Sequence, residues 1–311
     1  MQLPLSSQSI NQIVRGPRTK LIAFALLLLL GAILWWRHDT AITARPALWQ
    51  AVKDDRTVYL FGTIHAVPIK ARWLSPKIED AALRSDALML EIANLEAERA
   101  DRHVFEQLAR SPNLPPVTDR LAPADRPRLA ALVRKAPNAM SGIDGYESWG
   151  AALLVSAAAS GDLGLSTNNA GEALFQRMFV DQSKPVIGLE TVDGQLSLFD
   201  RLPEVEQRAL LTEAIREAED APHLYGELYE SWSSGHVAAL EKQFLAPLRN
   251  ASHRREVLLD NRNARWARRI DQWSSQRGSI LFVAVGAGHL LGPGSLQSRL
   301  AALGWKINRL Q

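Results

Sequence analysis

The chain has 311 residues, of which 47% are hydrophobic and 22% are charged, and this composition is that of an ordinary globular protein. It contains no cysteine, which excludes disulfides, thiolate metal sites and a cysteine nucleophile. The formal net charge of +3 arises in residues 1–38, which hold four basic residues and no acid, so that 32 basic and 33 acidic residues remain elsewhere. A nucleic-acid-binding domain usually carries a basic stripe on its folded part. We therefore expect no nucleic-acid partner.

The N-terminal segment predicts attachment to a membrane. Residues 21–36, LIAFALLLLLGAILWW, carry no charge and are preceded by Lys20 and followed by Arg37. This run is slightly longer than the apolar core of a cleavable signal peptide, which has about 7–15 residues. It is close to the lower bound of about 17 residues for a spanning helix, and Trp35 and Trp36 are suited to the membrane interface.

These features favour an uncleaved signal anchor, a transmembrane helix at 21–37, and a cleaved signal peptide is the alternative. The basic leader, residues 1–20, is expected to stay in the cytoplasm under the positive-inside rule. Residues 45–311 would then form an extracytoplasmic domain, in the bacterial periplasm.

Apolar runs bounded by turn residues predict the strands of this domain. Strands are expected at 57–64, 86–92, 185–189, 279–289 and 305–310. Helices are expected at 76–84, over most of 203–276, and at 295–303. The stretch at about 95–182 has a mostly helical pattern and lies between two strands. Helices bracketed by buried strands predict an α/β or α+β domain with a helical insert at about 95–182.

Four of the predicted strands end at a titratable residue. These residues are His65, Glu91, Glu190 and His289. The two histidines follow the same Gly-x-x-His pattern, and the chain has only seven histidines. Because ligands bind at the carboxyl ends of strands in open α/β sheets, we expect the four side chains to converge on one site. The alternative is that both histidines are packed at strand ends, since histidine is intermediate in burial.

Two kinds of hydrolytic chemistry fit such a set. His65, His289 and Glu91 could ligate a divalent metal (Mn, Co or Zn) that acidifies water, with Glu190 as general base. Alternatively, histidine and glutamate could activate water by acid–base catalysis without a metal. A third reading is a non-catalytic protein that binds a metal or haem in the same crevice. The residues alone do not choose among these alternatives.

An arginine-rich helix over residues 252–273 supplies two further candidates. Arg262 and Asn263 would reach the site and bind a carboxylate or an oxyanion, or else belong to a solvated helix face. Other catalytic motifs are absent, because the sequence holds no H-E-x-x-H, no G-x-S-x-G and no P-loop. The glycine-rich VGAGHLLGPG lacks the third glycine of a dinucleotide fingerprint, so we expect no nucleotide there.

Five segments together resemble the TraB/GumN family, which includes the TIKI-type proteins. They are ALWQAVKDDRTVYLFGTIHAVP, LMLEIAN, KPVIGLETVDGQLSLFD, LLDNRNARWARRI and VAVGAGHLLGPGSL, and they follow the family's order. The resemblance covers about residues 47–311, and residues 97–180 match poorly.

The resemblance implies a central mixed sheet with pseudo-symmetric halves, similar to the ChaN and erythromycin-esterase folds. It also implies a metal-dependent hydrolase of the metalloprotease type, acting on a peptide or another polar small substrate. His65 and His289 would be metal ligands or catalytic histidines, Glu91 and Glu190 their acidic partners, and Arg262 and Asn263 catalytic support. Family members often carry a glycine and an aspartate before the helix that precedes GLET. This chain reads LSTNNAGEALFQRM there, which places in doubt one polar contact of the site.

Overall fold

The computed structural model describes residues 44–93, 98–161, 163–275 and 278–311. The predicted anchor at 21–37 and the leader before it lie outside the described residues. Within the four described ranges, no helix is both long and apolar enough to cross a membrane.

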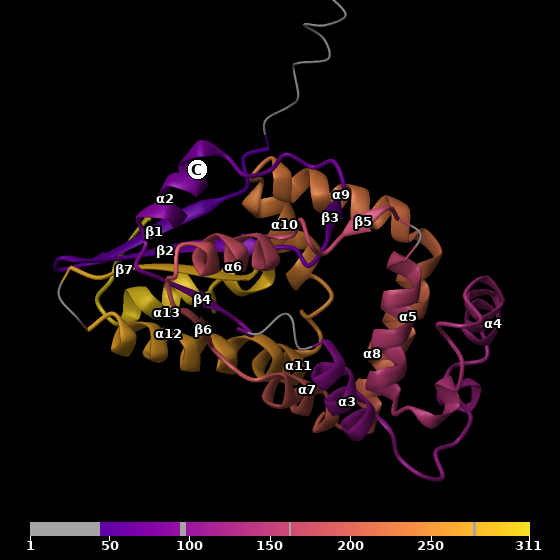
Figure 1. Ribbon diagram of the computed structural model, residues 1–311. Helices are drawn as coiled ribbons and strands as arrows, with labels where there is room; N and C mark the ends of the chain where they lie inside the picture. The colour runs from indigo at the N-terminus through magenta and orange to yellow at the C-terminus, as the bar shows by residue number, and fades with distance from the viewer. Residues whose placement is uncertain (1–43, 94–97, 162, 276–277) are drawn as a thin grey trace, which may run out of the picture. The chain divides into compact units, whose positions relative to one another are not determined.

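A six-stranded mixed sheet forms the centre of the domain (Figure 1). Its strands are β1 (Leu48–Lys53), β2 (Arg56–Thr63), β4 (Ala87–Leu90), β6 (Val186–Gly188), β7 (Ile280–Gly286) and β8 (Lys306–Arg309). They lie in the order β6-β4-β7-β2-β1-β8. The strands β6, β4, β7 and β2 are parallel to one another, whereas β1 and β8 run antiparallel to their neighbours. The predicted mixed α/β architecture is therefore confirmed.

Helices cover both faces of this sheet (Figure 1). One face packs against α2 (Pro76–Arg84), α6 (Gly171–Asp181), α9 (Ala221–Ser233) and α10 (Val237–Leu245). The other face packs against α12 (Asn261–Trp273) and α13 (Leu296–Ala302). Side chains of β7 alternate between these two cores, with Phe282 in the first and Val283 in the second. This two-sided burial explains why the parallel strands appear in the sequence as continuous apolar runs.

A third hydrophobic core lies in a helical cluster beyond the sheet. Its helices are α3 (Glu98–Ala109), α4 (Arg126–Lys135), α5 (Ser148–Ser160), α7 (Val192–Asp200) and α8 (Glu204–Glu217). At its centre is Trp149, which is fully buried. The expected insert at 95–182 corresponds to α3 through α6, but α6 packs on the sheet, and α8, from later in the chain, packs against α5.

The remaining elements are short. They are β3 (Val67–Pro68), η1 (Val117–Arg120), η2 (Ile143–Gly145), β5 (Leu165–Ser166), η3 (Ala218–Asp220), α11 (Ser252–Arg255), η4 (Glu256–Asp260) and η5 (Ala287–Leu290). The element η4 is a π-helical turn directly before α12. Such turns are rare and often occur at functional sites.

Candidate functional site

The carboxyl ends of the four parallel strands meet at one edge of the sheet, as the sequence predicts. Glu91 directly follows β4, and Glu190 lies just beyond β6. Backbone pairing continues past these strands, because Glu190 N–H donates to the Glu91 carbonyl at 2.9 Å, and this pairing holds the two residues together. His65 follows β2, and His289 lies in the short helical turn η5 after β7.

A buried arginine joins three of these groups. Arg262 enters from the first turn of α12, and its Nη2 donates to Glu91 Oε2 at 2.6 Å. Nε donates to Glu190 Oε2 at 3.2 Å, and Nη2 donates to the other oxygen of the same carboxylate. The carbonyl of Leu258, in the π-helical turn, accepts from Nη1 at 3.0 Å. Hydrogen bonds of this length between charged groups fix both the position and the orientation of the two carboxylates.

The hydrogen bonds of His289 define its protonation. Arg262 Nη1 lies 3.0 Å from His289 Nε2, and since a guanidinium can only donate, Nε2 is the acceptor. The proton is therefore on Nδ1, which donates to Asn263 Oδ1 at 2.7 Å. The Asn263 amide in turn donates to the carbonyls of His289 and Gly294, at 3.3 and 2.9 Å. Burial lowers the pKa of His289 to about 3, so the imidazole is neutral.

Glu91 is held by donors from three elements. The backbone N–H of Gly286 donates to Oε1 at 2.7 Å, and Gln195 Nε2, from α7, donates to Oε2 at 2.9 Å. Arg262 completes the set. Burial alone would raise the pKa of this carboxyl, but the positive charges and the Gly286 hydrogen bond outweigh burial and hold the pKa below its ordinary value. Glu91 is therefore ionised at neutral pH.

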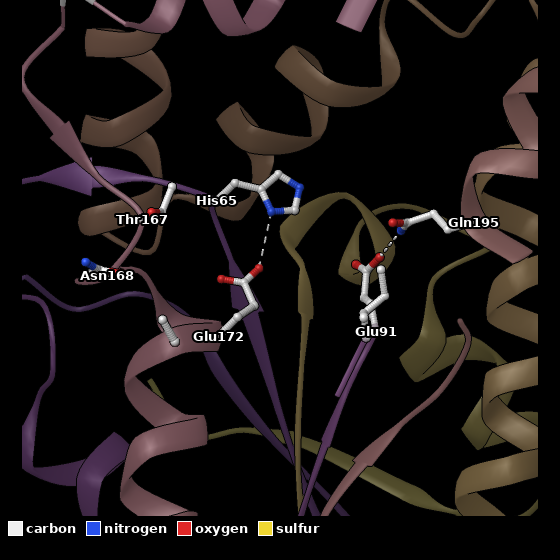
Figure 2. Close-up of a pocket in the computed structure, with 8 residues that line it drawn as sticks. His65, Glu91, Thr167, Asn168, Glu172 and Gln195 are labelled. Atoms are coloured by element: carbon white, nitrogen blue, oxygen red, sulfur yellow. Dashed lines mark hydrogen bonds and ion pairs between the residues drawn. The ribbon is translucent and has the colours of Figure 1, made fainter. Parts of the chain in front are cut away.

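His65 lies on the other side of a pocket and has a carboxylate partner of its own (Figure 2). Its Nδ1 is 3.4 Å from Glu172 Oε1, and Thr63 Oγ1 donates to the same oxygen at 2.5 Å. The His65 side chain is 87% exposed, whereas that of Glu172 is 14% exposed. The interaction with Glu172 raises the pKa of His65 to about 9. At neutral pH this imidazole is therefore a cation that faces solvent.

The pocket between the two groups has a volume of about 300 Å³. Figure 2 shows the His65–Glu172 pair on one side and Glu91 with Gln195 on the other. A larger cavity next to it is lined in part by Arg262 and His289. Glu190 and Asn263 line neither cavity. The structure thus places Glu91 and His65 where a substrate can reach them, and it places Glu190 and Asn263 behind the site.

The model of the TraB/PrgY/gumN family matches residues 47–309, which is most of the chain. The chain belongs to this family. No curated protein and no solved structure gives a match. The family resemblance inferred from the five sequence segments is therefore confirmed.

Two site residues of this TraB/PrgY/gumN protein are not evident from its sequence. Glu172 begins a helix instead of ending a strand, and 109 residues separate it from Thr63, its hydrogen-bond partner. It lies in the segment where the chain departs from the family's usual glycine and aspartate, and it supplies a carboxylate to the pocket. Gln195 lies in the first turn of α7, four residues after Thr191, whose hydroxyl accepts from Gly194 N–H at the helix start.

The predicted metal ligands His65, His289 and Glu91 can be compared with this geometry. Both ring nitrogens of His289 are hydrogen-bonded to protein groups, so the ring has no lone pair left for a metal ion. The guanidinium of Arg262 occupies the position between the carboxylates where a cation is needed. No group of three or more His, Asp or Glu side chains among the described residues is arranged to hold a metal ion. In this arrangement His289 does not fit the role of a ligand.

Proposed function

We propose that this protein is a hydrolase in which Glu91 and the His65–Glu172 pair act on water and substrate across the pocket. The supporting observation is that a fixed carboxylate and a carboxylate-bound imidazole face one another across about 300 Å³ of open space. Their pKa values are shifted apart, with that of Glu91 lowered and that of His65 raised. Titratable groups with opposite shifts in one cleft are typical of an acid–base pair.

The two groups have the protonation states that the reaction requires at neutral pH. Ionised Glu91 accepts a proton from a water molecule as the water oxygen attacks the carbonyl carbon of the substrate. Protonated His65 donates from Nε2 to the leaving group, while Glu172 at Nδ1 holds the ring, as the carboxylate of a catalytic triad orients its histidine. Arg262 and Gln195 fix the Glu91 carboxylate. Glu190 and His289 are positioning residues that act through Arg262, and Asn263 acts through His289.

The predicted divalent metal, whether Mn, Co or Zn, stays a prediction. No step of the proposed reaction runs through it, because His289 is engaged by Arg262 and Asn263. The pseudo-symmetric halves of a ChaN-like or erythromycin-esterase-like sheet also stay an expectation from the family resemblance. The same holds for the membrane anchor at 21–37 and the periplasmic position of the domain.

Removal of the base tests the proposal. The full chain would be assayed against a panel of peptide amides and small polar esters, as wild type and as Glu91→Gln. The variant should lose at least about a hundredfold in kcat/KM, the usual contribution of a general base. Glu230→Gln, at an exposed position on α9, is the matched control and should retain full activity. Circular dichroism would show that both variants are folded.

Two results would contradict the proposal. The first is equal activity of wild type and Glu91→Gln. The second is no hydrolysis of any panel member together with tight haem binding, seen as a Soret band that is lost in His65→Ala. That second result would support the non-catalytic alternative.

A further inference from the structure

A second cavity of about 620 Å³ lies beside the proposed site. It shares the lining residues His65, Glu91 and Gln195 with the first pocket, so the two spaces adjoin at these side chains. The volume is in the usual range for small-molecule sites, about 300–1,000 Å³. The site residues thus lie at the mouth of a larger space that the proposed reaction does not use.

This cavity lies in the seam between two of the hydrophobic cores. Its side chains from α9, α10 and η4 pack against the core of the sheet, and those from α5 and α7 pack against the helical cluster. Six of these lining residues are Leu228, Phe244, Leu259, Leu153, Leu196 and Phe199. All six are half-buried. Apolar side chains that remain partly uncovered between two packed cores form a surface that an apolar ligand can bury.

The hydroxyl groups in the cavity wall already have acceptors within the protein. Tyr225 Oη donates to the Ala66 carbonyl at 2.8 Å, and Ser160 Oγ donates to the Ser156 carbonyl at 2.9 Å. Thr63 donates to Glu172. Away from the mouth, the wall is built mainly from side chains of helices, whose backbone groups pair within each helix.

We propose that the second cavity binds the aliphatic chain of an acyl ester whose carbonyl lies at the shared mouth, between His65 and Glu91. This inference rests on the proposed hydrolase function and names its substrate class. A peptide in the same space would bury N–H and C=O groups, and most of the wall consists of helices whose own backbone groups are already paired. An acyl chain carries no such groups, and its burial is favourable along its whole length.

The reaction is an ester hydrolysis with a simple balance of atoms. The water oxygen forms a bond to the acyl carbon, and one water proton passes to Glu91. The bond between the acyl carbon and the alcohol oxygen breaks, and that oxygen takes the proton of His65. The products are a fatty acid, whose chain remains in the cavity until release, and a free alcohol.

Chain-length dependence of the rate tests this inference. The full chain would be assayed with para-nitrophenyl acetate, butyrate, octanoate and laurate. We expect kcat/KM to rise about fourfold for each methylene group that the cavity buries, until the cavity is full. Leu228→Trp should lower the ratio of octanoate to acetate activity at least about tenfold, because the indole projects into the cavity and takes up part of the space for the chain. Leu83→Trp, on the 45% exposed Leu83 of α2, should keep the wild-type ratio. Rates that do not depend on chain length in the wild type would overturn the inference.

A binding measurement separates this inference from the proposed function. Dansylated undecanoic acid should gain fluorescence with wild type and with Glu91→Gln, and it should fail to do so with Leu228→Trp. Binding of this kind without any hydrolysis would uphold the acyl site and contradict the hydrolase. Hydrolysis of the esters without chain-length dependence and without binding of the dansylated acid would contradict only the acyl site.

Discussion

Arg262 donates a hydrogen bond from Nη1 to Nε2 of His289 at 3.0 Å, and the same guanidinium binds the carboxylates of Glu91 and Glu190. Trp266 packs on both partners, with its ring 4.6 Å from the guanidinium and 4.3 Å from the imidazole centroid. The second Gly-x-x-His motif therefore supplies an acceptor that holds an arginine. The first motif presents its histidine to solvent, so the two motifs have different roles.

Substitution of the central arginine should destabilise the fold. Arg262→Leu leaves the carboxylates of Glu91 and Glu190 buried without their main partner, and breaking such a pair usually costs about 3–5 kcal/mol. Urea unfolding would measure the loss. Arg265→Leu, at an exposed position on the same helix, should change the free energy of unfolding by no more than about 0.5 kcal/mol. If the two substitutions lower the free energy of unfolding equally, the buried network does not hold the site together.

His289 should make the protein labile to acid. Its pKa is about 3 in the folded chain and 6.5 in the reference state, so between these values only the unfolded chain binds the proton. The contribution of His289 to the free energy of unfolding is fully present above pH 6.5, and it is lost as the pH falls toward 3. Thermal unfolding between pH 5 and 6.5 should show a slope of about 1.4 kcal/mol per pH unit at most.

The slope should be smaller in His289→Asn and unchanged in His103→Asn, which replaces an exposed histidine of α3. Slopes are compared instead of absolute stabilities, because the asparagine also removes hydrogen bonds. If His289→Asn keeps the wild-type slope, His289 is not buried in its neutral form.

Gly286 should be required for the position of Glu91. A Cβ at this residue would lie 3.1 Å from Glu91 Oε1, on a backbone whose N–H binds that same oxygen. Gly286→Ala should therefore shift the carboxylate by a few tenths of an ångström and lower kcat/KM about tenfold. Gly226→Ala is the control, since a Cβ there meets nothing within 4 Å. Full activity of Gly286→Ala would mean that Glu91 does not need this alignment.

The metal prediction is tested by metal content after reconstitution with Mn, Co or Zn. The hydrogen bonds of His289 predict that His289→Ala leaves the metal content of the folded protein unchanged. A stoichiometric metal that is lost in both His65→Ala and His289→Ala would instead confirm the ligand set inferred from the sequence. It would also require His289 to give up its hydrogen bond with Arg262 and to bind the metal instead.

Much of the fold could be predicted from the sequence. The strands that are buried on both faces stand out as apolar runs. The strands β4, β6 and β7 lie within the expected ranges, and β2 begins one residue before its expected start. The helix at 76–84 is confirmed with its bounds, because Ser75 caps it and Pro76 occupies its first turn.

The strand β1 was not predicted. Only Leu48 and Ala51 of its six residues are buried, and the turn that joins it to β2 contains Asp54 at φ 55° instead of a glycine. The two sequence signals of a β-hairpin, alternating apolar residues and a glycine in the turn, are therefore weak here.

The candidate site could be predicted only where strands point to it. His65, Glu91, Glu190 and His289 follow parallel strands, so their convergence follows from sheet geometry. Glu172 and Gln195 reach the same edge from the first turns of helices. Their approach depends on how α6 and α7 pack, and no local pattern encodes that packing. Hydrogen bonding also decides that His289 faces Arg262, which the motif alone does not reveal.

The pH dependence of hydrolysis by wild type and Glu172→Gln tests the acid–base mechanism most directly. In the wild type, kcat/KM should fall on the alkaline side as His65 loses its proton, near pH 9. An amide at position 172 carries no charge to stabilise the imidazolium, so the alkaline fall in kcat/KM should occur at lower pH in the variant. An alkaline limb at the same pH in both proteins would contradict the assignment of His65 and Glu172 as the acid of the reaction.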